Sequence, residues 1–350
     1  MSSNTKYNIE FENSEEWTEV EFLQSPARLH FGLLEVCADQ PRLYGGIGAM
    51  IEQPAIRLSL HASPSLAITE NMACFIEADE PWKSRIELVA NRWMQSVSPD
   101  AGLPTTSQPI RLRLDNSPQT HAGLGSGTQL ACATVSLLNR WYNKDLPVPL
   151  DQLARMSLRG KRSFVGLAGH QIGGFIVDRG LSPTNAARTV DRIDIPPLWY
   201  VLVAKPTSTP AISGVIENDY FGKSQSPNPH RESMWKMITD IIVPALQASD
   251  LNRFGQALYE YGRDAGRVFS RVQGGIYRDR NVTSLIDWIR AQGVLATGQT
   301  SWGPSVYAIL GSQSDAEALH QKLLIDFPSG VECMTTAFNH SGYYSLATST

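Results

Sequence analysis

A glycine-rich segment between an expected strand and an expected helix constrains this chain most. Residues Ile110–Leu114 alternate apolar and polar side chains, which is typical of a strand, and apolar positions over Leu130–Trp141 predict a helix that begins near Thr128. Three glycines fall within Gly123–Gly127, between the two elements. Glycine lets the backbone approach a ligand closely, and a helix start offers unpaired N–H donors with a partial positive charge. The segment Gly123–Thr128 therefore predicts an anion site, with phosphate as the usual anion.

Two familiar phosphate-binding loops do not match this segment. A Walker loop needs a lysine after its last glycine, and none follows Gly127. The dinucleotide-binding fingerprint spreads three glycines over six positions and usually follows the first strand of the domain. A glycine turn that merely allows close helix packing is the structural alternative.

Composition excludes several classes of protein. With 350 residues and 42% hydrophobic content the chain can bury a large core, more readily as two lobes than one, and 18% charged residues argue against disorder. A net charge of −4 shows no basic footprint for nucleic acid, and the four cysteines form no Cys-x-x-Cys pair. Neither a signal peptide nor an apolar membrane span is apparent, so we expect a cytoplasmic protein without membrane or nucleic-acid partners.

Strands and helices mix without strict alternation, which favours an α+β two-lobe architecture over a doubly wound sheet. Residues 1–20 are expected to form an acidic tail or an edge strand. Residues 21–195 form the N-terminal lobe with the glycine loop, and residues 196–350 form the C-terminal lobe. The paired prolines after Ile195 mark this boundary, because they interrupt both strand ladders and helices.

Four glycine-rich segments occur in the order found in the GHMP superfamily of small-molecule kinases. They are Ser25–Gly32, Gly45–Gly48, Gly123–Gly127 and Gly298–Ser305. Together with Arg162-Ser163, Gly173–Asp178 and Ser301–Pro304, they resemble a non-kinase branch, the β-ribofuranosylaminobenzene 5′-phosphate synthases.

The resemblance implies a fold and a reaction. The fold expected from it has an N-terminal ribosomal-S5-like lobe and a C-terminal ferredoxin-like lobe, with the ligand in the cleft between them. The reaction condenses phosphoribosyl pyrophosphate with para-aminobenzoate or a related benzoate, releasing CO2 and pyrophosphate, in tetrahydromethanopterin biosynthesis. It also implies Mg²⁺ or a similar divalent cation as cofactor, no use of ATP, and a homodimer.

Departures from the kinase motifs favour the non-kinase branch but do not exclude a kinase. Kinases of the superfamily commonly place a catalytic Asp shortly before a Gly-Gly pair, yet no Asp or Glu occurs between Arg159 and Gly174. An ATP-dependent small-molecule kinase and a non-catalytic ligand-binding regulator stay open as alternatives.

Candidate site residues fall into three groups. No residue is assigned as a metal ligand. The expected catalytic residues are Arg28, His30, Arg162 and Asp178. The expected phosphate and pyrophosphate ligands are Gly123, Leu124, Gly125, Ser126, Gly127, Thr128, Ser163, Arg263 and Arg267. The expected substrate-binding residues are Gly45, Gly46, Gly48, Ser301 and Trp302.

Each side chain also has a structural alternative. The two catalytic arginines could form structural ion pairs, although a guanidinium matches carboxylate and phosphate well. His30 lies on the same strand face as Arg28 and could instead be a satisfied core group. Asp178 could be a base, a metal ligand or a turn former, and Trp302 could stack on the aromatic substrate or belong to the core. Arg263 and Arg267 share one helix face, which could be merely solvated.

Overall fold

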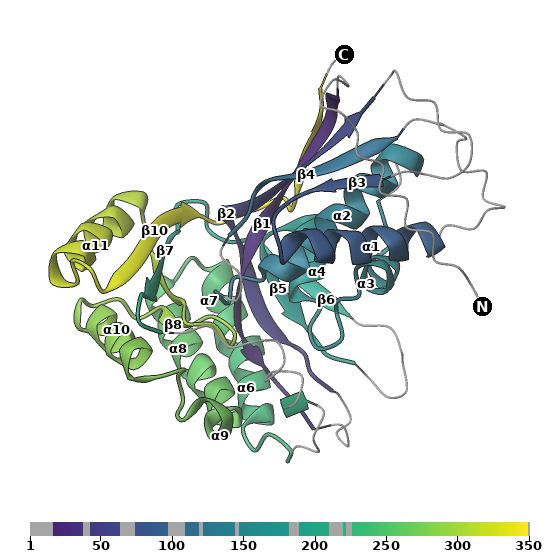
Figure 1. Ribbon diagram of the computed structural model, residues 1–350. Helices are drawn as coiled ribbons and strands as arrows, with labels where there is room; N and C mark the ends of the chain where they lie inside the picture. The colour runs from purple at the N-terminus through teal and green to yellow at the C-terminus, as the bar shows by residue number, and fades with distance from the viewer. Residues whose placement is uncertain are drawn as a thin grey trace.

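The computed structural model describes residues 17–37, 43–63, 74–96, 109–118, 122–143, 147–181, 189–209, 220–221 and 226–348. The expected acidic segment up to residue 20 therefore lies mostly outside the described residues. Within them, two lobes stand side by side, and the long first strand runs between their two groups of helices (Figure 1). The α+β two-lobe architecture is confirmed.

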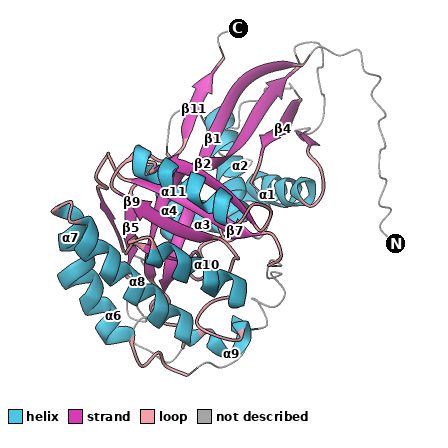
Figure 2. Cartoon of the chain, turned by 90° about the vertical axis from the view of Figure 1, so that its left-hand side faces the viewer, coloured by secondary structure: helices cyan, strands magenta, loops and turns pink. Residues whose placement is uncertain are grey.

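The N-terminal lobe is a twisted, mostly antiparallel sheet covered by helices. Its elements are β1 (Thr18–Leu33), β2 (Gly46–Ala62), β3 (Cys74–Glu77), α1 (Trp82–Ser96), β4 (Ile110–Asn116), α2 (Ser126–Asn143), α3 (Leu150–Ser157), α4 (Val165–Ile172), β5 (Phe175–Asp178) and β6 (Val190–Ile193). The strand order is β11-β1-β2-β4-β3, and β5 joins β2 to β6. The last strand of the chain, β11 (Tyr344–Ala347), pairs with β1 beside the C-terminus (Figure 2), so the second lobe ends before it.

The C-terminal lobe has the strand order of a ferredoxin-like fold. Its elements are β7 (Tyr200–Pro206), α6 (Arg231–Met237), the π-helical turn η2 (Ile238–Ile242), α7 (Val243–Gln247), α8 (Leu251–Val268), α9 (Ser270–Gln273), α10 (Arg280–Ala291), β8 (Thr297–Gln299), β9 (Val306–Leu310), α11 (Gln313–Asp326) and β10 (Val331–Ala337). The antiparallel order β10-β7-β9-β8 places the fourth strand beside the first and the third beside the second. This arrangement confirms the second lobe expected from the motifs.

Alternation along β1 separates the core from the site. Leu29 and Phe31 are fully or almost fully buried in the core shared with α8 and the second sheet, and Phe31 also reaches the wall of the cleft. Arg28 and His30 point to the opposite face, as a period of two requires, and both line a cleft. No helix among the described residues is long and apolar enough to cross a membrane.

Candidate active site

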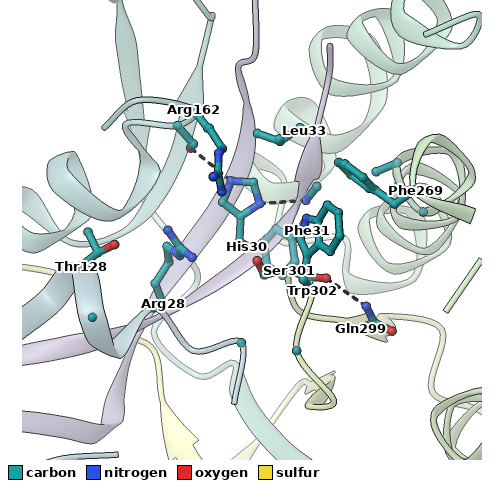
Figure 3. A pocket seen from close by; sticks show the side chains of 18 of the residues that line it. Arg28, His30, Phe31, Leu33, Thr128, Arg162, Phe269, Gln299, Ser301 and Trp302 are labelled. Atoms are coloured by element: carbon teal, nitrogen blue, oxygen red, sulfur yellow. Dashed lines mark hydrogen bonds between the residues drawn. The ribbon is translucent and has the colours of Figure 1, made fainter. Parts of the chain in front are cut away.

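A cleft of about 480 Å³ opens where the two lobes meet at β1. Its walls come from the end of β1, the glycine loop with the first turn of α2, the segment Leu158–Ser163, the second half of α8 and the segment Ser301–Gly303. In Figure 3, Arg28 and Thr128 lie on one side, Phe269 and Trp302 on the other, and His30 between them.

The glycine loop is built as an anion-binding helix start. Helix α2 begins at Ser126, two residues earlier than expected, and Gly125, Ser126, Gly127 and Thr128 line the cleft. The backbone at Gly123 and Gly125 has φ of +87° and +75°, which favours glycine. A Cβ on Gly123 would stand 2.6 Å from the Thr300 carbonyl oxygen, so the loop packs directly on the third motif. The Thr128 amide donates to the Gly125 carbonyl at 2.9 Å, whereas no backbone acceptor is found among the described residues for the amides of Ser126 and Gly127, both of which line the cleft.

Hydrogen bonds hold the three motif segments together around β1. The Arg28 amide donates to the Leu124 carbonyl at 2.9 Å, and the Ser301 amide donates to the His30 carbonyl at 2.8 Å. The Thr300 hydroxyl accepts from the His30 amide at 3.0 Å and donates to the Gly123 carbonyl at 3.1 Å. Segments far apart in the sequence are therefore fixed as one cleft wall.

Cationic side chains surround the loop. The cations that line the cleft are Arg28, Arg85, Arg159, Lys161 and Arg162. A Cβ on Gly127 would lie 3.4 Å from both Arg85 Nη1 and Arg159 Nη2, so two guanidinium groups flank its bare backbone. None of the described residues lining the cleft is an Asp or Glu, which makes this end suited to a multiply charged anion.

The same lining bears on the expected Mg²⁺. The described cleft residues offer hydroxyl groups but no carboxylate, and the described residues hold no group of three His, Cys, Asp or Glu able to bind a metal. Mg²⁺ is usually held by one or two carboxylates together with substrate phosphates. The residues present therefore do not fit a protein-held Mg²⁺.

His30 is positioned as a neutral donor. Its Nδ1 accepts from the Gly32 amide at 3.2 Å, so Nε2 must carry the proton of the neutral ring. Nε2 then donates to Ser163 Oγ at 3.1 Å, and that oxygen also accepts from the Val165 amide at 3.1 Å. Burial, reinforced by the charge of Arg28, lowers the pKa of His30 well below its usual value. Ser163 Oγ therefore accepts two hydrogen bonds from the protein. Its hydroxyl proton stays available for donation to a ligand in the cleft.

Replacing His30 with Gln should therefore lower kcat/KM without moving its pH dependence. We expect a loss of roughly 10-fold, because the Ser163 hydroxyl loses a partner that orients it. A pH profile of kcat/KM for wild type and variant measures this. If the wild-type profile shows a step near the usual histidine pKa and H30Q abolishes it, His30 is a proton-transfer group instead.

The opposite end of the cleft is aromatic. Leu33, Phe269 and Trp302 line it, and the Phe269 and Trp302 ring centroids are 4.6 Å apart. Tyr220 and Phe221 complete this aromatic cluster behind them. The Arg162 guanidinium lies 4.1 Å from the centroid of Phe221, so a cation borders the aromatic surface. Trp302 is thus both buried among aromatic residues and part of the cleft wall.

Several expected site residues lie outside the cleft. Asp178 is fully buried, and its carboxylate accepts from the Phe164 amide at 2.7 Å and the Gly180 amide at 3.0 Å. It therefore fixes the backbone beside Ser163 and is neither a base nor a metal ligand in the cleft. Leu124 packs its side chain in the core. Their assignments as site residues are corrected accordingly.

The second glycine cluster and two arginines also have structural positions. Gly46 and Gly48 lie within β2 and pair with Leu33 and His30 of β1, where a Cβ on either would strike the β1 backbone. Gly45 packs in the same way on the backbone of residues 178–180. Arg263 lies 5.6 Å from the Tyr259 ring centroid, and Arg267 pairs with Asp264 on the same helix. None of these residues lines the cleft, because α8 presents Gly262, Ala265 and Gly266 to it instead.

Sequence reasoning missed several cleft residues. Arg159 and Lys161 flank Gly160 immediately before Arg162, and this run of cations was a visible signal. Arg85 belongs to α1, and nothing in its spacing indicated the cleft. Phe269 follows the end of α8 and Gln273 ends α9, and no motif in the sequence marked either residue.

Comparisons with known proteins agree with this architecture. The GHMP kinases N-terminal domain profile matches residues 88–174, and the GHMP kinases C-terminal profile matches residues 242–329. A solved homoserine kinase from Cytophaga hutchinsonii superposes with a TM-score of 0.67 at 16% identity, covering 97% of this chain and 100% of that one. A mevalonate diphosphate decarboxylase from Trypanosoma brucei has a TM-score of 0.64 at 13% identity, covering 94% and 98%. The chain belongs to the GHMP superfamily.

Curated relatives place it within that superfamily. A β-ribofuranosylphenol 5′-phosphate synthase of Methanothermobacter thermautotrophicus is 28% identical over 82% of this chain and 88% of the relative. Its namesake in Archaeoglobus fulgidus is 28% identical over 89% and 95%. These relatives confirm the branch indicated by the motifs and the prediction of an enzyme.

Proposed function

We propose that the chain transfers a phosphoribosyl group from phosphoribosyl pyrophosphate to a para-substituted benzoate, releasing pyrophosphate and CO2, in tetrahydromethanopterin biosynthesis. The observation that carries this proposal is the two-ended cleft. Its cationic end, with the amides of Gly125–Gly127, suits a diphosphate and a phosphate monoester. Its aromatic end, with Phe269 and Trp302 beside Arg162, suits a flat aromatic carboxylate.

The relatives' names bear on the ring. Both name a ribofuranosylphenol phosphate, so para-hydroxybenzoate stands beside para-aminobenzoate as the proposed acceptor. Either ring donates electrons from its para substituent to the carbon that bears the carboxylate.

The bond changes balance without a side-chain nucleophile. The anomeric C–O bond breaks and its electron pair leaves on the diphosphate, whose charge the amides of Gly125–Gly127 and the flanking arginines stabilise. The ring carbon bearing the carboxylate bonds to the anomeric carbon. The C–CO2⁻ bond then breaks, and its electron pair restores aromaticity. Holding both substrates in one cleft supplies the positioning that such a reaction requires.

Two alternatives are less well supported. A kinase of the superfamily would need a group to take the proton of the attacking hydroxyl, and the described lining holds no carboxylate for it. The solved kinases share only the fold with this chain. A non-catalytic regulator does not follow from relatives that are named as synthases.

Release of CO2 tests the proposed function directly. Para-aminobenzoate and para-hydroxybenzoate, each labelled in the carboxyl group, should release labelled CO2 only when phosphoribosyl pyrophosphate is present and without ATP. Reactions with MgCl2 and with EDTA in its place measure the metal dependence separately. If neither ring releases labelled CO2 at a sufficient protein concentration and with metal supplied, the proposed reaction is wrong. ATP-dependent phosphorylation of an alcohol would establish the kinase instead.

A further inference from the structure

One polar side chain in the aromatic end of the cleft has no role in the reaction described so far. Gln273, at the end of α9, is only 7% exposed and lines the cleft beside Phe269. Its amide nitrogen donates to two backbone carbonyls, Ile276 O at 2.7 Å and Gly266 O at 3.2 Å. Both hydrogens of the amide group are therefore used by the protein.

These two bonds fix which way the amide points. Rotating it by half a turn would set Oε1 against two carbonyl oxygens and leave both nitrogen hydrogens without these partners. Oε1 must therefore face away from the two carbonyls, as a hydrogen-bond acceptor at the cleft wall. No hydrogen bond to it is found among the described residues.

The backbone is shaped to hold this arrangement. Gly266 lies inside α8, where glycine costs helix stability. A Cβ at this position would collide with the Ile276 carbonyl. The absence of a side chain lets the turn after α9 close onto α8, which brings both carbonyls to the same amide.

The neighbouring amide side chain is already engaged. Gln299, the other amide of the lining, accepts from the Arg278 amide at 2.6 Å and donates to the Ser301 carbonyl at 3.0 Å. Gln273 Oε1 is thus the acceptor of a largely buried side chain at the cleft wall, and a ligand that covered it without offering a donor would lose binding energy.

We propose that Gln273 selects the ring substrate by accepting a hydrogen bond from the substituent opposite the carboxylate, which must therefore carry an N–H or O–H. This inference rests on the proposed function for the orientation of the ring. The carboxyl-bearing carbon must face the anomeric carbon, next to the diphosphate end of the cleft, so the para substituent extends toward the aromatic wall. An acceptor at that wall repels a carboxylate, which opposes the reversed orientation.

The choice of substituent also serves the reaction. A hydrogen bond from the para group to Oε1 increases electron donation into the ring, at the carbon that forms the new bond. The same bond excludes rings of equal size that lack a donor, because burial then leaves the amide oxygen unpaired.

Calorimetric titration of the full chain tests this selection, with pyrophosphate present. The ring ligands are 4-hydroxybenzoate, 4-aminobenzoate and 4-fluorobenzoate, the last of which has no donor. Wild type should bind the two donor rings at least about 10-fold more tightly than the fluoro ring. In Gln273→Met, which keeps the length but removes the acceptor, the ratio should fall to within about 3-fold.

Two further variants guard against a folding effect. Gln273→Asn withdraws the amide oxygen by one methylene and should also reduce the preference for donor rings. If only one of the two Gln273 variants folds, that variant is sufficient for the test. Gln292→Met removes an amide that donates to a helix carbonyl outside the cleft lining and should leave the ratio unchanged. Wild type without a donor preference, or a folded Gln273 variant that keeps it, would overturn the inference.

The titration separates this inference from the proposed function. Ring binding needs no turnover, so a donor preference lost in Gln273→Met stands even if no CO2 is released. Conversely, CO2 release together with an unchanged ratio in the variant sustains the reaction and removes Gln273 from it.

Discussion

Replacing Gly127 with valine should abolish turnover while leaving the fold intact. We expect kcat/KM to fall by at least about 100-fold, the scale seen when donors no longer reach a developing negative charge, because the added side chain displaces the anion from them. A valine side chain would occupy the space between Arg85 and Arg159 where the anion is expected to lie. Steady-state kinetics, with calorimetric titration of pyrophosphate, measures the effect.

The structure explains why this glycine can be changed without unfolding the protein. A Cβ at Gly127 would meet its nearest neighbours, both arginine side-chain ends, at 3.4 Å, which is ordinary contact. At Gly125, by contrast, a φ of +75° and a Cβ only 3.1 Å from Arg28 Nε would add strain. Gly311→Val is the matched control, since its Cβ would first meet Leu251 at 3.6 Å, away from the cleft. Full activity and pyrophosphate affinity in G127V would mean that the anion binds elsewhere.

Acid should destabilise the protein through a buried histidine behind the glycine loop. His170 is fully buried, and burial lowers its pKa to about 3 from 6.5. Between these values the unfolded chain binds a proton that the folded chain does not. The free energy of unfolding should therefore be fully present above the unfolded pKa and fall as pH decreases toward 3, by about 1.4 kcal/mol per pH unit for this group. His30, whose pKa is also lowered by burial, contributes in the same direction.

A chain of hydrogen bonds makes His170 sensitive to its charge. Ser25 donates to Gln129 Oε1 at 2.8 Å, so it must accept from His170 Nδ1, also at 2.8 Å. His170 Nε2 then accepts a hydrogen bond from the Ser136 hydroxyl at 3.0 Å. At the other end of the chain of hydrogen bonds, the Gln129 amide nitrogen donates to the Gly166 carbonyl. A second proton on the ring would break this order and bury a charge.

Denaturant unfolding from neutral pH down to pH 3–4 measures this effect. His170→Gln should be less stable than wild type near neutral pH but lose stability less steeply in acid. His320→Gln, on α11, is the control and should keep the wild-type slope. An acid slope in H170Q equal to that of wild type would show that other groups cause the acid sensitivity.

The sequence predicted the fold where local patterns were strong. The strand expected over Ile110–Leu114 and the helix expected to begin near Thr128 both occur, with ends shifted by a few residues. Helix α4 was missed, because its sequence Val165–Ile172 holds two glycines and reads as a glycine-rich loop. Its stability comes from packing on β1 and β2, where Gly166 and Gly169 admit Arg28 and Met50.

Site residues divide in the same way. Arg28 and His30 were predictable from strand alternation, and the anion loop from its glycines, because both depend on neighbours in the chain. Asp178 was misassigned because its sequence position cannot show that its oxygens are taken by the Phe164 and Gly180 amides.

The sequence alone was sufficient to predict the superfamily, the anion loop and the strand face that carries Arg28 and His30. These are properties of backbone conformation and residue order, which act over a few positions. Only the tertiary structure decided that Arg85, Arg159 and Gln273 line one cleft. It also decided that Asp178 holds the backbone beside Ser163 and that Arg267 pairs with Asp264 outside the cleft. Such choices depend on how helices and sheets pack across hundreds of residues, and no local pattern encodes those distances.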